Sequence, residues 1–258
     1  MSGNQIKKIT GHLLWLRTSS KESMLTVEEL FKRLSFGQLS NLAMAQEPKG
    51  SIRLEDQNTV INALNSALIR IYTRFSLYER QLMIQQVAHV TNYHLDKRFS
   101  RVNPNRLPQH QGYIYDLPNE PFEDDAIKIL AVYDKCGEAL PLNVASNPRS
   151  VYTPYPTILQ IPYPEEDLPV VVQYQAAHPK LQYGVKEAEV RVPLALEDAL
   201  LSYTAYQIFT GIGTQEATTK AAEHMQMFNN VCQDVEDQGA ASILDQVGHT
   251  KFQQRGFR

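Results

Sequence analysis

The spacing of apolar residues changes twice along the 258-residue chain, and this limits the folds that the chain can adopt. Apolar side chains recur every three or four residues between about residues 26 and 76, alternate with polar ones between residues 82 and 174, and return to helical spacing after residue 196. A period near 3.6 is typical of amphipathic helices, and a period of two is typical of strands. The pattern predicts an α+β fold, in which a small antiparallel β domain is inserted into a helical body of four to five helices.

Several segments carry signals for the start or end of a helix. Thr26-Val27-Glu28-Glu29 has the spacing of a capping box, and Ser35-Phe36-Gly37-Gln38 has the same form, so we expect two short helices that end before residue 48. Asp56 is expected to cap a longer helix that ends near residue 76. Two helices are predicted near the C-terminus, the first ending at Gly211 and the second beginning at Thr214.

The middle of the chain favours strands. Expected strands are residues 82–84, 87–90, 93–95, 126–133 and 169–174. Residues 152–163 contain three prolines, which favour an edge position, and residues 96–125 are predicted to be mostly loop. These elements divide the chain into an N-terminal arm (1–25), a helical body (26–77 plus 190–237), a β domain with long loops (78–189) and an extended C-terminal tail (238–258).

Composition excludes several classes of protein. Apolar residues make up 43% of the chain and charged residues 21%, which is ordinary for a folded domain and not for a disordered chain. Two cysteines cannot form a disulfide-rich scaffold, and a mean hydropathy of -0.36 is not that of an integral membrane protein. No signal peptide or apolar span of about 20 residues is seen, so we expect synthesis and use in a cytoplasm.

Charge is unevenly distributed along the chain. The net charge is +7 for residues 1–112, -7 for residues 113–190 and -3 for residues 191–258, which gives -3 in total. This balance does not favour a nucleic-acid-binding protein, since such domains are normally basic. This separation of positive and negative charge along the chain suits stacking between charged partners, and it is equally compatible with ordinary variation of surface charge.

Catalytic motifs are not found in the sequence. There is no nucleophile elbow and no phosphate-binding loop, and the two cysteines, Cys136 and Cys232, are 96 residues apart. Cys232 lies on the apolar face of a predicted helix, where we expect it to pack as a small hydrophobic residue. His89 and His94 are five residues apart, so they face opposite sides of a strand and do not form a metal site. We therefore predict a protein that is not an enzyme and has no cofactor.

Two acidic triplets and a group of tyrosines are the candidate functional residues. Carboxylates in Glu123-Asp124-Asp125 and Glu165-Glu166-Asp167 could bind a divalent metal or act as acid and base, and they could equally keep strand ends soluble. Tyr152, Tyr155 and Tyr163 alternate with prolines, which is compatible with an aromatic surface for a partner or with packing at a sheet edge.

The order of elements and four sequence segments resemble head-to-tail adaptor (connector) proteins of tailed bacteriophages. The segments are residues 27–31, 35–42, 62–68 and 193–203, the last followed by the helix through residues 223–234. The plan is also similar to that of tubular tail protein A of short-tailed phages. The resemblance covers residues 26–95 and 190–237, and it extends to the β region in plan only.

The resemblance implies a structural role in the virion at the interface of head and tail, with assembly in the host cytoplasm. Such proteins form a ring, usually of twelve copies, beneath the portal protein. They extend the channel for double-stranded DNA, and they provide a platform for the tail nozzle or another proximal tail protein. Sequence-specific nucleic-acid binding and membrane contact are not implied.

On this basis, four residues of the tail are candidate portal anchors: Phe252, Arg255, Phe257 and Arg258. The acidic triplets are candidates for the face toward the channel or the tail, where negative charge would keep DNA from adhering. Two alternatives stay open. One is another virion or tail interaction protein whose β domain recognises a protein or a glycan, and the other is a metal-dependent hydrolase that uses the triplets.

Overall fold

The protein has an α+β fold, as the sequence predicts. The computed structural model describes residues 24–45, 50–101, 112–116 and 121–238. In these residues the α-helices are α1 (Val27–Phe36), α2 (Gln57–Arg74), α3 (Glu197–Ile212) and α4 (Gln215–Asp237). Short 3-10 helices are η2 (Ala43–Ala45), η3 (Lys97–Phe99) and η4 (Leu194–Leu196).

The strands form three antiparallel sheets within the described residues. The strands are β1 (Met24–Thr26), β2 (Glu79–Gln85), β3 (Asn92–His94), β4 (Ile114–Tyr115), β5 (Ala126–Tyr133), β6 (Tyr152–Tyr155), β7 (Ile158–Gln160), β8 (Pro169–Ala176) and β9 (Glu189–Arg191). Their order is β1-β9 in the first sheet, β4-β2-β8-β5 in the second and β3-β7-β6 in the third.

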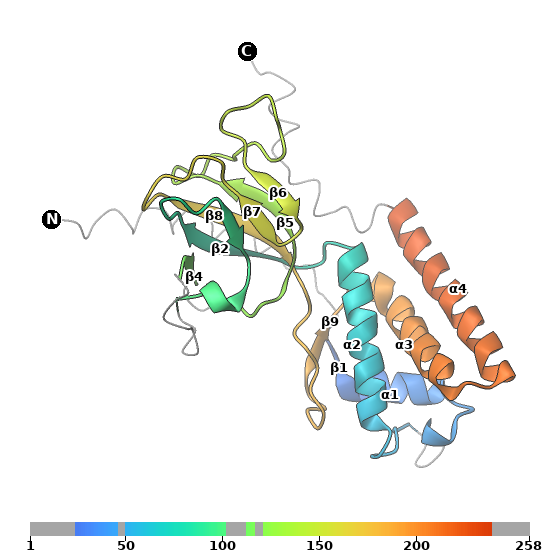
Figure 1. Cartoon of the computed structure of the whole chain (residues 1–258). Coiled ribbons are helices and arrows are strands. Elements are labelled where there is room, and N and C mark those ends of the chain that lie inside the picture. Colours follow the sequence, from blue (N-terminus) through green and yellow to red (C-terminus); the bar gives the residue numbers. More distant parts are fainter. Residues whose placement is uncertain (1–23, 46–49, 102–111, 117–120, 239–258) are drawn as a thin grey trace.

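The four helices pack as one unit, which we call the helical layer. Helices α2, α3 and α4 lie side by side with α3 between the other two, and α1 crosses their lower ends (Figure 1). Helix α3 is buried on most sides because its sequence from residue 199 onward carries no charge. At the start of α1, Thr26 and Glu29 form the predicted capping box. The two strands β1 and β9 pair beside this layer.

The other two sheets pack around a second core, and we call this unit (residues 78–176) the β barrel. At one margin, Ile129 N of β5 donates to Pro156 O of the β6–β7 turn at 2.8 Å, and beside β4, Tyr113 N donates to Phe99 O of η3 at 3.1 Å. The largest side chains fully inside are Tyr93, Tyr174, Leu82 and Ile84. Both sheets therefore bury one face in a shared hydrophobic core, and neither exposes both of its faces to solvent.

The helical layer and the β barrel are joined by hydrogen bonds as well as by the chain. The Gln175 amide is 1% exposed and donates to Phe75 O at 3.0 Å, and also to Tyr72 O. Next to it, Ala176 N donates to Tyr78 O at 2.9 Å. A buried amide with these partners fixes the end of β8 against the end of α2. We call this hydrogen-bonded contact between the end of β8 and the end of α2 the braced joint.

The expectation of a second short helix after residue 35 is wrong. Helix α1 ends at Phe36, and the chain then folds back so that Leu39, which is fully buried, donates to Leu34 O at 2.9 Å. The Ser35 hydroxyl, predicted as a cap, instead donates to Ala45 O at 3.0 Å and accepts from Gly50 N at 3.1 Å. A tertiary role for this side chain has replaced the local one.

Three smaller expectations also fail. Residues 87–90 form a turn with His89 at a φ of 66°, and not a strand. Helix α3 continues past the predicted stop to Ile212, and Gly213 ends it in the left-handed conformation. Asp56 makes no capping bond, because its carboxylate pairs with Arg53 at 2.8 Å. Where the structure describes residues 96–125, they are mostly loop, as predicted, and they include η3 and β4.

Candidate interaction surfaces

The second acidic triplet lies on a turn that two glutamines hold in place. Gln86 is 4% exposed and its side-chain oxygen accepts from Glu165 N at 2.9 Å, while the Gln85 amide donates to Asp167 O at 2.6 Å. Asp167 has a φ of 62°, a conformation that Asp and Asn adopt more readily than most residues. The side chains of Glu165, Glu166 and Asp167 are all exposed. The turn thus presents three carboxylates to solvent.

The first acidic triplet is divided between solvent and the interior. Glu123 and Asp124 are exposed, but the Asp125 side chain is 13% exposed and pairs with Arg80 at 2.8 Å. Tyr174 also donates to Asp125, at 3.1 Å, and burial together with this carboxylate raises the pKa of Tyr174. Asp125 therefore has a structural position, and only two carboxylates of this triplet point outward.

The two triplets lie at opposite ends of the β barrel. Residues 165–167 precede the start of β8, and Ala177 N, just after its end, donates to Asp125 O at 2.7 Å. At about 3.3 Å per residue, the length of β8 separates them by roughly 20 Å. They do not combine into one metal or acid–base site. Within the described ranges, no group of three or more His, Cys, Asp or Glu side chains could hold a metal ion.

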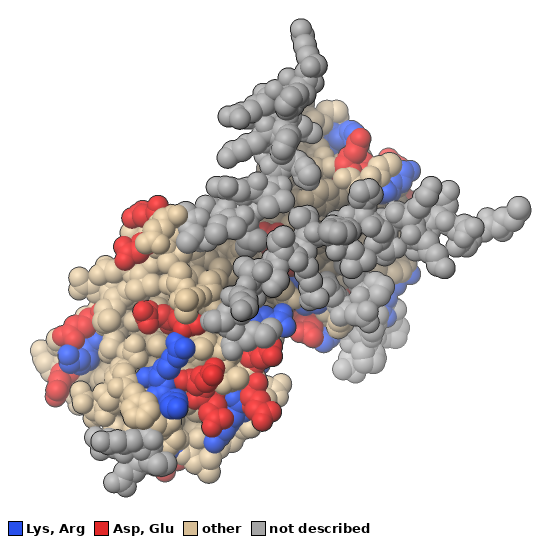
Figure 2. All heavy atoms as spheres, turned by 180° about the vertical axis from the view of Figure 1, so that it is seen from behind, with Lys and Arg blue, Asp and Glu red and all other residues tan. Residues whose placement is uncertain are grey.

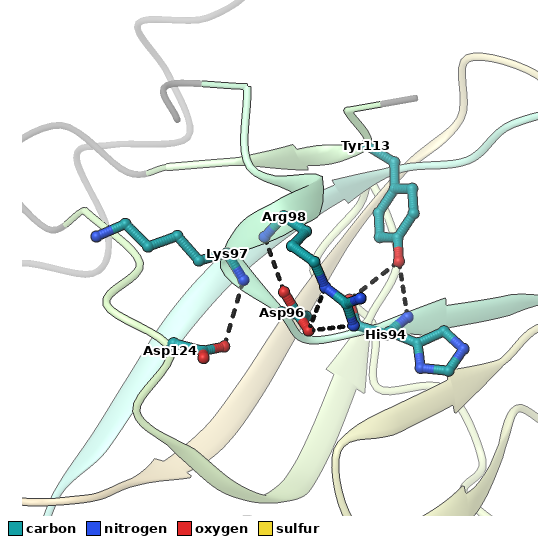
Figure 3. A network of polar contacts seen from close by, with 6 residues as sticks. All are labelled: His94, Asp96, Lys97, Arg98, Tyr113 and Asp124. Atoms are coloured by element: carbon teal, nitrogen blue, oxygen red, sulfur yellow. Dashed lines mark hydrogen bonds and ion pairs between the residues drawn. The ribbon is translucent and has the colours of Figure 1, made fainter. Parts of the chain in front are cut away.

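Asp124 belongs to a polar network around η3 (Figure 3). Its carboxylate accepts from Lys97 N at 3.3 Å, and Asp96 accepts from Arg98 at 2.6 and 2.9 Å. The Arg98 hydrogen bond holds the pKa of Asp96 below its usual range. Asp124 has a φ of 66°, so it too occupies a turn position that favours its residue type.

The same network assigns His94 a place on the barrel surface. The Tyr113 hydroxyl accepts from His94 N at 2.8 Å and donates to His94 O at 3.0 Å (Figure 3). Burial raises the pKa of Tyr113, which suits a hydroxyl used as a structural link. The His94 imidazole itself is exposed, and His89 lies in the separate turn after β2.

The three candidate tyrosines do not form one surface. Tyr155 is 66% exposed at the turn that joins β6 to β7, whereas Tyr163 is 80% exposed beyond the opposite end of β7. Tyr152 is half-buried and pairs with Gln160. Tyr155 and Tyr163 are thus two separate exposed rings.

The predicted portal anchors Phe252, Arg255, Phe257 and Arg258 lie outside the described residues, as does most of the N-terminal arm. Of that arm, Met24 and Leu25 belong to β1 and pair with β9. Cys232 is fully buried on α4, as expected, and Cys136 is exposed in a turn.

One exposed region had no role in the sequence analysis, namely the connection between β8 and β9 (residues 177–188). It contains a hollow of about 200 Å³ lined by His178, Pro179, Lys180, Leu181, Gln182, Val185, Ala188 and Glu189. A second, shallower hollow lies where Tyr183 of this connection meets Leu54, and these two side chains are 53% and 70% exposed. Its sequence signal is only a glycine between exposed apolar residues, Tyr183-Gly184-Val185, which does not distinguish it from an ordinary turn.

Charges of both signs are mixed on the face of the molecule shown in Figure 2. Basic and acidic side chains alternate there and do not gather into a patch of one sign. None of the helices in the described part of the chain combines the length and apolar character of a membrane span.

No protein-family model matches the chain, and no curated protein matches it.

Proposed function

We propose that this protein is a virion structural protein that forms an adaptor ring beneath the portal of a tailed bacteriophage. The proposal rests on the resemblance of residues 26–95 and 190–237 to head-to-tail adaptors. The structural observation that supports it most is the braced joint, where Gln175 binds the carbonyls at the end of α2. A component that links two larger assemblies has to hold its two parts in a defined relation, and buried hydrogen bonds provide this.

In this proposal twelve copies, the usual number in the family, contact one another head to tail around the channel. Such a ring is closed by a heterologous contact repeated between neighbours. The portal protein binds on one side, and the tail nozzle or another proximal tail protein binds on the other. Double-stranded DNA passes through without sequence-specific binding, and the protein has no turnover and no membrane contact.

The exposed carboxylates are the candidates for the channel or tail face. Glu165, Glu166 and Asp167 are held out at the end of the β barrel that is remote from the joint. Glu123 and Asp124 lie near the joint, and Asp125 is left out of this role because Arg80 neutralises it. Negative side chains beside a passing duplex repel its phosphates and prevent adhesion.

Electron microscopy of the protein with its cognate portal tests the proposal. We expect negative-stain images of the full-length chain mixed with portal to show an added ring. Replacing Phe252, Arg255, Phe257 and Arg258 together with alanine should abolish the ring, because aromatic and arginine anchors dominate interface energetics. A ring that still forms with this quadruple variant would show that the anchors are misassigned. Absence of any complex across salt concentrations would reject the adaptor function itself.

Neutralising the remote triplet gives a functional prediction. Virions that carry Glu165→Gln, Glu166→Gln and Asp167→Asn should eject DNA several-fold more slowly. With less repulsion from the channel face, the phosphates of the passing duplex adhere to the protein and retard it. Asparagine is chosen at residue 167 because it also adopts a positive φ. The measurement is ejection followed by a DNA-binding dye in vitro. Substituting the exposed Glu55→Gln and Glu216→Gln, which lie on the helical layer, provides the control, and an unchanged rate for the triple variant would remove the channel role.

A second candidate function is recognition of a glycan by the β barrel. It is favoured by the exposure of Tyr155 and Tyr163, which are 66% and 80% exposed. Exposed tyrosines are frequent in recognition surfaces because they add contact area with little loss of entropy. A glycan array should then show binding that Tyr155→Ala abolishes and that Tyr183→Ala, in the connection between β8 and β9, leaves unchanged.

A further inference from the structure

His178 occupies the point where the chain leaves the β barrel for the helical layer. Both ring nitrogens are engaged: Nε2 lies 3.1 Å from Arg191 N, and Nδ1 lies 2.7 Å from Pro179 O. An amide N–H can only donate and a carbonyl can only accept. Nε2 is therefore unprotonated and Nδ1 carries the hydrogen, so the geometry fixes one neutral tautomer.

The partner of Nε2 is a residue that other contacts also depend on. Arg191 belongs to β9, which pairs with β1 at the beginning of the described chain. On its other side, Arg191 O accepts a hydrogen bond from the Tyr72 hydroxyl of α2. The Tyr72 ring meets the His178 ring edge-on, with centroids 5.6 Å apart. The imidazole thus links β9 to the connection that follows β8, and it also contacts α2 through Tyr72.

The groups around His178 oppose a positive charge in its present position. Burial lowers its pKa below the usual range for histidine, and the nearby Arg191 guanidinium lowers it further, whereas the Pro179 carbonyl acts in the other direction. The Arg191 guanidinium lies over the Tyr78 ring, 6.0 Å from its centroid. Lys180 and Glu189 are the charged residues that line the adjoining hollow of about 200 Å³.

We propose that His178 is a pH-sensitive latch that fastens β9, and with it β1, to the helical layer. Protonation places a hydrogen on Nε2, which then faces the Arg191 N–H, and the bond between them is lost. The imidazolium can instead turn toward the hollow, where Glu189 is the one acidic side chain in the lining. The latch therefore has a closed neutral state and an open cationic state, each with its own partners.

The direction of the pH dependence follows from the lowered pKa. A group whose pKa is lower in the folded state contributes stability above its unfolded value, which is near 6.5 for histidine, and loses it as the pH falls through the folded value. Between these two pKa values, each unit by which the pH falls raises the ratio of open to closed latch about tenfold. The latch is closed at neutral pH and opens in acid.

NMR on the full chain tests the proposal in two ways. In the wild-type protein, the imidazole ¹⁵N shifts of His178 should report the Nδ1–H tautomer at pH 8 and a protonation midpoint below 6.5. Over the same pH range, the Arg191 amide should lose hydrogen-exchange protection about tenfold per unit, after correction for intrinsic exchange. The Val172 amide in the β barrel is the internal control and should not change.

Variants separate a latch from a merely structural contact. His178→Gln can accept from Arg191 N without titrating, so its Arg191 protection should be independent of pH, while His94→Gln, on an exposed histidine, should behave as the wild type. Persistence of the pH dependence in His178→Gln would overturn the proposal. So would an ordinary midpoint or the opposite tautomer in the wild-type spectrum, a result that does not depend on the variant being folded.

Discussion

Replacing Asp125 with alanine will destabilise the protein by about 3 to 5 kcal/mol, because it leaves the Arg80 charge buried without its partner. The Arg80 side chain is 9% exposed and its remaining hydrogen bond, to Pro121 O at 2.8 Å, involves only one end of the guanidinium. Its Nε atom is already buried with no partner in the structure. Loss of the carboxylate also leaves the Tyr174 hydroxyl without its acceptor. Urea unfolding of the full-length chain measures the change.

Two controls show whether the unpaired charge is the cause. The double variant Arg80→Met with Asp125→Leu should recover most of the stability, since apolar residues of similar volume often replace a buried pair without loss. Glu223→Ala breaks the exposed pair with Lys220, whose side chains are 54% and 49% exposed, and should change stability by less than about 1 kcal/mol. Equal effects of Asp125→Ala and Glu223→Ala would contradict the burial argument.

The same ion pair explains why the three acidic residues of the first triplet, which look alike in sequence, differ in exposure in the structure. Asp125 joins strand ends across 45 residues through Arg80, and nothing local in the sequence marks it off from Glu123 or Asp124. Asp124 and Asp167 have a local reason to be aspartate, since both lie at positive φ. Contiguous charges therefore predict an acidic surface well, but they do not predict which member faces inward.

Elements that depend on local patterns could be predicted from the sequence. The capping box at Thr26, the limits of β5 and the buried positions of α2 follow from residue types only three or four apart, or from strict strand composition. Thr214 caps α4 as expected, by accepting from Ala217 N at 3.2 Å. Such signals are satisfied within one turn or one strand, so tertiary contacts rarely override them.

Elements that depend on distant partners could not be predicted. Strand β1 exists because β9, more than 160 residues later, pairs with it, and the two sheets of the barrel are linked by bonds such as that from Ile129 N to Pro156 O. The His178 latch needs Tyr72 and Arg191, which come from two other elements. No short-range periodicity encodes these pairings, and the failure of the helix expected after Ser35 has the same origin.

A second large effect is expected in the helical layer, where Phe228→Ala should cost about 3 to 5 kcal/mol. Phe228 is fully buried on α4, and its ring lies 4.9 Å from that of Tyr203 on α3 in an edge-on arrangement. The substitution removes this contact and leaves a cavity between two helices that pack along most of their length. Met227→Ala, at the next position and 49% exposed, should change stability by less than about 0.5 kcal/mol.

The two cysteines provide a direct readout of this effect. Cys232 lies one turn beyond Phe228 on the same buried face, and burial raises the pKa of its thiol, so it should react slowly with a thiol reagent in the native protein. Cys136 is exposed and should react at once, which makes it an internal reference. In Phe228→Ala the Cys232 rate should rise about tenfold for each 1.4 kcal/mol of stability lost, because the thiol reacts only from open states.

Comparing Phe228→Ala with Asp125→Ala tests whether the two cores unfold together. Phe228 lies in the helical core and Asp125 accepts from Tyr174 of the barrel core, and Gln175 couples the two cores by binding the end of α2 from within the barrel. If the joint transmits stability, each single variant should shift one common urea transition, followed by circular dichroism and by Cys232 labelling alike. A biphasic curve, in which Asp125→Ala leaves Cys232 labelling unchanged, would show that the units unfold separately. The joint would then position the barrel without stabilising it, and the main structural support for an adaptor would be lost.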